Sequence, residues 1–138
     1  MNIDQLISVG PTDRSLTVGT DSRWIRIGDA APRDLVRFGS SRRLLEILVQ
    51  KRFDAPNTAV SANALIELVW PGESMRYSAG LLRVYAAVSR LRQLGLGAIL
   101  VTRDDGYLVD ANVRVMREPR DETPRNVTWQ AAAIPAAS

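Results

Sequence analysis

The 138-residue sequence contains neither cysteine nor histidine. Without cysteine the chain can form no disulfide and no thiolate metal site, which fits a reducing compartment. Without histidine it lacks the commonest general base and a common metal ligand. The sequence also has no glycine-rich phosphate loop and no pairing of a nucleophile with a base. These absences favour a protein that is not an enzyme and that uses no metal and no cofactor.

Long hydrophobic runs are missing as well, because no apolar stretch approaches the roughly 20 residues that cross a membrane. The first residues, Met1-Asn2-Ile3-Asp4, lack the basic start of a signal peptide. With 46% apolar and 24% charged residues, the composition is that of an ordinary soluble protein. We therefore expect a cytoplasmic protein with no membrane partner.

Lysine is nearly absent: 17 of the 18 basic residues are arginine, and Lys51 is the exception. Arginine suits bidentate contacts with phosphate and with guanine, which favours a nucleic-acid partner. A GC-rich genome would enrich arginine equally well, and a net charge of +3 is a weak argument by itself. The composition leaves both explanations open.

The apolar pattern changes its period twice along the chain, which predicts an α+β fold. Short β-rich pieces between residues 15 and 38 predict a small antiparallel sheet, with strands near 15–18, 23–27 and 35–38. Helical spacing then predicts three helices, over about 41–52, 62–70 and 79–94. Ser40 or Ser41 would cap the first helix and Ser61 the second.

The segment after the third predicted helix is typical of a β-hairpin. Gly95 and Gly97 end that helix, and two β-rich triplets then surround the turn signal Asp105-Gly106. We place this hairpin at residues 99–109, and 113–116 could add one more edge strand. The whole domain spans 15–116, between an N-terminal arm at 1–14 and a disordered tail at 117–138.

The third predicted helix has two distinct faces. Leu81 and Val84 lie with Val88 and Leu91 on an apolar face, because their spacing follows the helical period. Arg83 and Arg90 lie on the opposite face, together with the small residues Ala86 and Ala87. We predict that the three helices share one core, formed by Leu45, Leu48, Leu65, Val69, Trp70, Val84, Val88 and Leu91.

The order of sheet, three helices and hairpin is that of a winged helix, and three motifs support a named group. Val88-Ser-Arg-Leu-Arg92, followed by Val101-Thr-Arg-Asp-Asp-Gly-Tyr107, resembles the end of the third helix and the wing of OmpR/PhoB-type effector domains of bacterial response regulators. Ala64-Leu-Ile-Glu-Leu-Val-Trp70 is similar to the second helix of that family. The resemblance covers about residues 15–115.

This resemblance implies a transcriptional regulator that binds double-stranded DNA, either alone or as a homodimer. Helix 79–94 would lie in the major groove and the hairpin 99–109 would act as the wing at the adjacent minor groove. The loop 71–77, with Met75, Arg76 and Tyr77, would face RNA polymerase or another regulatory protein. By position, the DNA-binding residues would be Arg83, Ala87, Ser89, Arg90, Arg92 and Arg103.

Several positions depart from the family pattern and keep a second function open. Asp104 and Asp105 stand at the wing, where a phosphate would approach; Leu108 stands where the family often has an arginine, and Ala87 replaces a frequent histidine. Arg103 could contact DNA or pair with the two aspartates, and Arg92 could instead snorkel beside the core. The alternative function is a winged helix that has become a protein-interaction module.

Overall fold

The computed structural model describes residues 15–118, which divide into two units. The first, here called the sheet unit, comprises the described residues 15–37 and 114–118. The second, here called the helical unit, comprises Phe38–Val113. Together they contain a four-stranded sheet, three α-helices and a three-stranded sheet, which confirms the predicted α+β class.

The sheet unit is a mixed sheet rather than the antiparallel sheet predicted. It consists, in spatial order, of β4 (Arg33–Asp34), β3 (Trp24–Ile27), β2 (Ser15–Val18) and β8 (Arg114–Arg117). The turn η2 (Thr20–Ser22) joins β2 to its antiparallel neighbour β3, whereas β8 pairs with β2 in parallel. A parallel neighbour requires a long connection, and here the whole helical unit supplies it.

The predicted strand at 35–38 is also wrong. The strand β4 ends at Asp34, whose carboxylate accepts a hydrogen bond from the backbone N–H of Val36 at 2.8 Å. Such a contact two residues ahead bends the chain into a turn and competes with sheet pairing. The β-rich composition of 35–38 therefore does not extend the strand.

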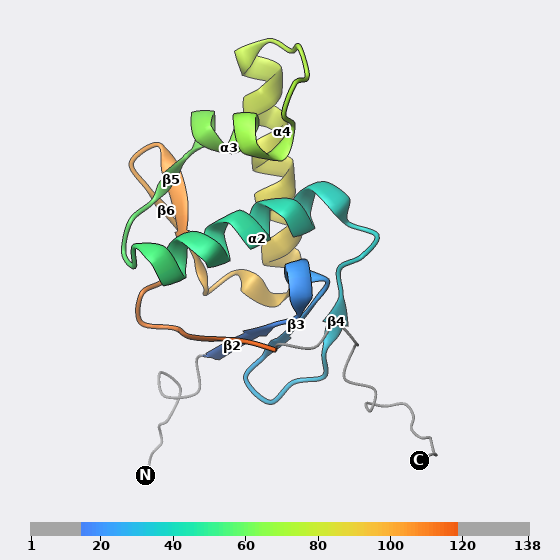
Figure 1. The fold of residues 1–138 in the computed structure, drawn as a ribbon, viewed down its shortest axis with the longest axis vertical. Helices are drawn as coiled ribbons and strands as arrows, with labels where there is room; N and C mark the ends of the chain where they lie inside the picture. Colours follow the sequence, from blue (N-terminus) through green and yellow to red (C-terminus); the bar gives the residue numbers. More distant parts are fainter. Residues whose placement is uncertain (1–14, 119–138) are drawn as a thin grey trace. The chain divides into compact units, whose positions relative to one another are not determined.

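The helical unit contains α2 (Gly39–Asp54), α3 (Ala62–Val69) and α4 (Tyr77–Leu91), and the chain continues from α4 into a π-helical turn, η3 (Arg92–Leu96). Each of the three helices packs against the other two (Figure 1). The strands β6 (Leu100–Arg103) and β7 (Gly106–Val109) form the predicted hairpin. The two-residue strand β5 (Val60–Ser61), which lies just before α3, pairs with β7 and completes an antiparallel sheet.

The serines at the two helix starts differ in their roles. The Ser61 hydroxyl accepts a hydrogen bond from the backbone N–H of Ala64 at 3.0 Å, which confirms the predicted cap of α3. Neither Ser40 nor Ser41 caps α2, because that helix begins after Phe38 and has no side-chain cap. Ser41 is buried instead, and its hydroxyl donates to the Ala87 carbonyl at 3.1 Å. This serine therefore ties α2 to α4.

The buried face of α4 is rotated slightly from the predicted one. Gly80 and Ala87 are buried on it, whereas Leu81 is only half-buried. Gly80 permits a close approach of α3, because a Cβ at this position would lie 2.8 Å from Cδ1 of Ile66. The smallest residues of α4 thus mark where the neighbouring helices come closest.

Seven of the eight predicted core residues are buried, and the exception is Trp70. Trp70 stands at the C-terminal end of α3 and is half-buried. Beside it, the guanidinium of Arg43 donates to the Val69 carbonyl at 2.8 Å. This contact satisfies one of the carbonyls that a helix end leaves without an intrahelical partner.

Val88 offers a direct test of this core. It is buried in the last turn of α4, so Val88→Ala should lower the free energy of unfolding by about 1–3 kcal/mol. Leu82 is the matched control, because its side chain on the same helix is 67% exposed. Urea denaturation should show little change for Leu82→Ala, and an equal loss in both variants would contradict the assigned faces.

Candidate nucleic-acid interface

The outward face of α4 carries uncharged side chains at its centre. Leu82, Ala86 and Ser89 are exposed there, and Arg83 and Arg90 flank them on one side. Ala87, predicted on this face, is only 5% exposed and lies on the inner face, so its side chain is not available to DNA. Its position follows from the helical period, since it lies three residues after Val84 on the same face.

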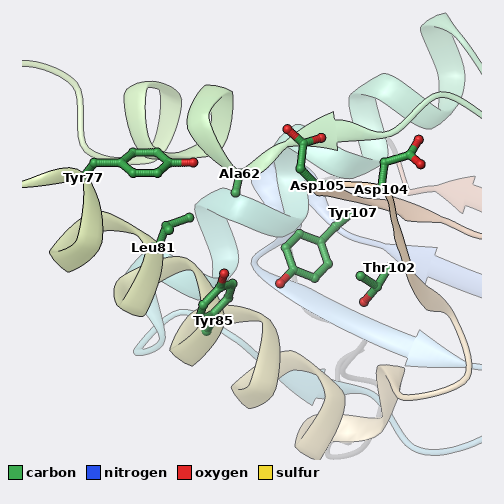
Figure 2. A pocket seen from close by; sticks show the side chains of 9 residues that line it. Ala62, Tyr77, Leu81, Tyr85, Thr102, Asp104, Asp105 and Tyr107 are labelled. Atoms are coloured by element: carbon green, nitrogen blue, oxygen red, sulfur yellow. The ribbon is translucent and has the colours of Figure 1, made fainter.

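The other flank of α4 borders a cavity of about 280 Å³ beside the hairpin, and Figure 2 shows its lining. Tyr77 and Tyr85, which are eight residues apart on α4, line it from the helix. Asp104, Asp105 and Tyr107 line it from the hairpin. Neither Tyr85 nor the cavity was predicted from the sequence, although the eight-residue spacing of the two helix tyrosines indicates one flank of a helix.

Tyr107 is the buried tyrosine of this cavity, with 8% of its surface exposed. Burial raises the pKa of its hydroxyl, and the neighbouring Tyr85 raises it further, while Arg92 lowers it. The hydroxyl therefore stays protonated at neutral pH and is available as a hydrogen-bond donor.

The raised pKa of Tyr107 predicts how the folded state responds to alkali. A group with a higher pKa in the folded state stabilises that state below its unfolded pKa, and the stabilisation is lost as pH rises through the folded pKa. The free energy of unfolding should therefore fall as pH rises past roughly 10, the ordinary pKa of tyrosine. In Tyr107→Phe the fall measured by urea denaturation should be smaller, and an unchanged fall would contradict this account.

Arg92 holds the end of α4 against the hairpin. Its guanidinium donates to the Leu100 carbonyl at 2.9 Å and to the Thr102 hydroxyl at 3.0 Å. The same guanidinium lies 5.9 Å from the centre of the Tyr107 ring. Of the two roles left open for Arg92, these contacts favour the structural one, and they place the side chain away from the outward face of α4.

Arg103 also has a partner that the sequence did not indicate. Its guanidinium donates to both the backbone carbonyl and the side-chain oxygen of Asn57, each at 2.8 Å. Asn57 accepts both bonds from a left-handed backbone conformation, with φ of 69°. Arg103 is exposed, so it anchors the hairpin to the loop after α2 while keeping part of its charge accessible to solvent.

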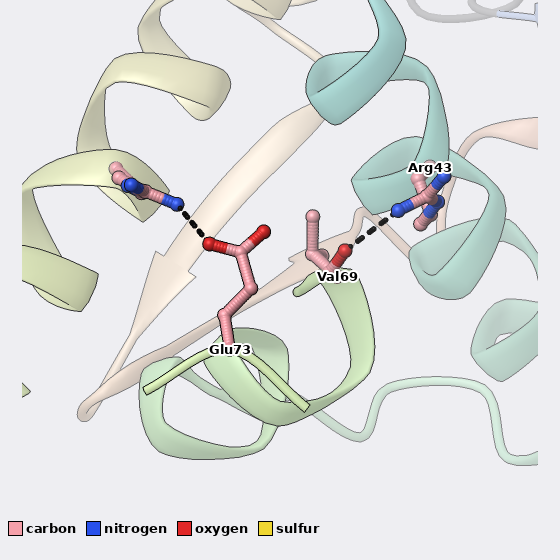
Figure 3. Close-up of polar contacts among 4 residues, drawn as sticks. Arg43, Val69 and Glu73 are labelled. Carbon is pink, nitrogen blue, oxygen red and sulfur yellow. Dashed lines mark hydrogen bonds and ion pairs between the residues drawn. The ribbon is translucent and has the colours of Figure 1, made fainter. Parts of the chain in front are cut away.

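Arg83 is half-exposed at the edge of the outward face. Its guanidinium pairs with the Glu73 carboxylate at 3.0 Å and lies 5.6 Å from the centre of the Trp70 ring. Figure 3 shows Glu73 on the loop after α3 with the dashed line of this ion pair, and the separate contact of Arg43 with Val69. An exposed ion pair of this kind is worth about 0–1 kcal/mol, so a phosphate can compete for the arginine.

Arg90 lies two turns further along the same edge of α4 and is exposed. Its guanidinium is 5.1 Å from the centre of the Phe38 ring, at the start of α2. Such a cation–π contact orients the side chain and leaves its N–H donors available. Ser89, next to it, is also exposed on the outward face.

The predicted partner loop is shorter than 71–77, because α4 begins at Tyr77. Arg76 is exposed at the start of α4 and Met75 is half-buried. Tyr77 is 56% exposed and lines the cavity beside the hairpin.

The chain shows no match to family models, to curated proteins or to solved structures. Within residues 15–118, no helix is long and apolar enough to cross a membrane. The function must therefore be inferred from the arrangement of side chains in the helical unit.

Proposed function

We propose that the protein is a sequence-specific transcriptional regulator that binds double-stranded DNA through a winged helix-turn-helix. In this proposal α3, the loop 70–76 and α4 form the helix-turn-helix, and β6 and β7 form the wing. The support is that α3 packs directly on α4 and that the hairpin is fastened to the end of α4 by Arg92. In such folds the second helix of the motif enters the major groove.

The observation that carries the proposal is the composition of the outward face of α4. Ala86 and Ser89 are small, so the helix backbone can approach the edges of the bases. Arg83 and Arg90 border them from one side, where their guanidinium groups can reach phosphates or guanine. Leu82 adds an apolar side chain that can contact a thymine methyl group.

The tip of the hairpin limits how strongly one copy would bind. Arg103 offers an exposed positive charge, but Asp104 and Asp105 are exposed beside it and should repel the DNA backbone. Two copies on a repeated site would recover affinity, since linked binding events raise the effective concentration without new contacts. We therefore propose that specific binding depends on two copies.

Selection from random-sequence duplexes tests this function. We expect enrichment of a repeated site, followed by an affinity that falls steeply and log-linearly with salt through counterion release. The slope gives the number of phosphates neutralised, at about 0.9 per contact. Failure to enrich any sequence, or failure to bind DNA even at low salt, would contradict the proposal.

A specific observation favours one second candidate, the protein-interaction module. Tyr77, Leu82 and Tyr85 are 56%, 67% and 49% exposed, which is unusual for large apolar side chains on one helix. A protein partner, such as RNA polymerase or another regulatory protein, could cover them. Apolar association would survive high salt, whereas DNA binding would not, so the salt titration separates the two functions.

A further inference from the structure

We propose that the cavity between α4 and the hairpin binds a single arginine side chain of a protein partner. This inference does not depend on DNA binding, because it concerns the flank of α4 opposite Arg83 and Arg90. The cavity is small, about 280 Å³, and it is open at the surface between Tyr77, Tyr85 and the hairpin tip (Figure 2). Its size suits one side chain rather than a whole helix.

The first line of support is the pair of carboxylates at the mouth of the cavity. Among residues 15–118, the side chains of Asp104 and Asp105 form no ion pair and no hydrogen bond. Two arginines that contact the hairpin are committed elsewhere, since Arg103 donates to Asn57 and Arg92 donates to Leu100 and Thr102. Two adjacent unpaired carboxylates attract a cation that the helical unit itself does not supply.

The second, independent line of support is the hydroxyl of Tyr107. The residue is more than nine-tenths buried and its side chain points into the cavity (Figure 2). Its hydroxyl makes no hydrogen bond with any residue that the structure describes. The hydroxyl is reached by solvent from the cavity, because it is not one of the fully buried polar atoms without a partner, so a ligand in the cavity can bind it in place of water.

The chemistry of the lining selects arginine. Tyr77 and Tyr85 present ring surfaces on which a planar guanidinium can stack, whereas the Tyr107 ring already lies beside Arg92. The carboxylates can accept the N–H donors of the guanidinium in pairs. Lysine carries a compact ammonium that is more strongly hydrated and cannot make the paired contact. We assign the arginine to a protein partner and not to a nucleic acid, because the phosphates of a nucleic acid would be repelled by the same two carboxylates.

The exposed rings around the mouth extend the surface that a partner would cover. Tyr77 and Tyr85 stand half out of the cavity and can pack against the residues that flank the bound arginine. Tyrosine and arginine are the residue types enriched at the energetic centres of protein interfaces. The cavity with its rim thus combines a charged anchor site with apolar surroundings.

The test is a titration of the isotope-labelled full chain with three tripeptides, followed by amide NMR shifts. The probes are acetyl-Ala-Arg-Ala-amide, the same peptide with lysine, and the same peptide with citrulline, which is nearly isosteric with arginine but neutral. We expect saturable shifts at residues 102–107 and around Tyr85 with the arginine peptide, at least tenfold weaker binding of the lysine peptide, and no binding of the citrulline peptide. Equal binding of all three, or shifts spread over the whole chain, would overturn the proposal.

Two variants sharpen the result. The double variant Asp104→Asn/Asp105→Asn keeps the shape of the hairpin tip and should weaken the arginine peptide at least tenfold, whereas Glu67→Gln, which removes an exposed carboxylate on α3, should not. DNA affinity should not fall in the double variant and should rise if the two carboxylates repel the DNA backbone, so that loss of peptide binding and loss of DNA binding are distinguishable. If the parent chain alone dimerises in sedimentation and the double variant does not, the occupant is a second copy and the partner-protein assignment is wrong.

Discussion

Replacing Arg83 and Arg90 together with alanine should lower DNA affinity by at least tenfold. Each arginine that contacts a base edge contributes about 1–3 kcal/mol, and every 1.4 kcal/mol is a factor of ten in affinity. Each that contacts a phosphate instead should reduce the salt slope by about one. Fluorescence anisotropy with the selected duplex, at several salt concentrations, measures both quantities.

Arg33 provides the matched control for this experiment. It is an exposed arginine on β4, in the sheet unit, so Arg33→Ala removes the same charge from a surface outside α4. Its affinity should stay within about threefold of the parent, since only the long-range electrostatic attraction changes. Of the single variants, Arg90→Ala should weaken binding more than Arg103→Ala, because Arg103 is held by Asn57. An unchanged affinity in the double Arg83/Arg90 variant would leave the protein-interaction module as the better function.

Among substitutions that add a single methyl group, Gly106→Ala should lower the free energy of unfolding the most. Gly106 lies within β7, and a Cβ there would overlap the carbonyl oxygen of Val60 in the paired strand β5. The neighbouring group is backbone, so it cannot move aside without breaking the pairing. We expect a loss of about 3 kcal/mol or more in the free energy of unfolding, at the upper end of overpacking effects.

Gly97→Ala is the control for that substitution. Gly97 has a helical φ of −59°, and the nearest atom to a Cβ there, the Arg92 carbonyl oxygen, is 3.8 Å away. Alanine at this position should be neutral or stabilising by about 0.4–1 kcal/mol, because it restricts the unfolded chain. Both values come from chemical denaturation, and a Gly106→Ala variant as stable as Gly97→Ala would show that β5 and β7 are not closely paired.

Gly106 also illustrates how a correct prediction can rest on the wrong residue. The pair Asp105-Gly106 correctly predicted a hairpin near residue 105, but the turn residues are Asp104 and Asp105, and Asp104 adopts the left-handed conformation with φ of 54°. The glycine is needed for the close approach of β5 instead. Similarly, Gly95 leaves the helical conformation inside η3, with φ of 118°, whereas Gly97 has a helical φ and does not need the freedom of glycine.

The three helices were predictable because their apolar residues repeat at the helical period and bury a common face. The buried face of α4 was harder to predict, because Gly80 and Ala87 are buried on it although both are small and only weakly hydrophobic. Small residues are needed there because Ile66 on α3 and Ser41 on α2 lie close to α4. That closeness is a property of the packed structure and not of the local sequence.

Strand partners were the least predictable part of the fold. β5 has only two residues, too few to show an alternating pattern, and it pairs with β7 through contacts about 45 positions away in the chain. β8 was predicted as an edge strand, but its parallel pairing with β2 joins residues that are about 100 positions apart. Local sequence carries no signal for pairings of this range.

The candidate site likewise has a part that the sequence predicts and a part that only the structure shows. The position of Arg83 and Arg90 on the outer side of α4 follows from the spacing alone. The attachments of Arg92 to Leu100 and of Arg103 to Asn57 depend on how the hairpin folds back, and the sequence indicated neither. From the sequence, Asp104 and Asp105 could have paired with Arg103. The structure shows Arg103 bonded to Asn57 instead, which leaves the two carboxylates at the hairpin tip unpaired.

The most direct measurement of the central claim is an amide NMR footprint of the selected duplex on the labelled full chain. The account predicts that the largest shifts fall on the outward face of α4, at Leu82, Arg83, Ala86, Ser89 and Arg90, with smaller shifts at the hairpin. Amides of α2 that lie away from α4, such as those around Gln50 and Asp54, should change little. Shifts centred on those α2 amides or on the sheet unit, with α4 unperturbed, would contradict the account.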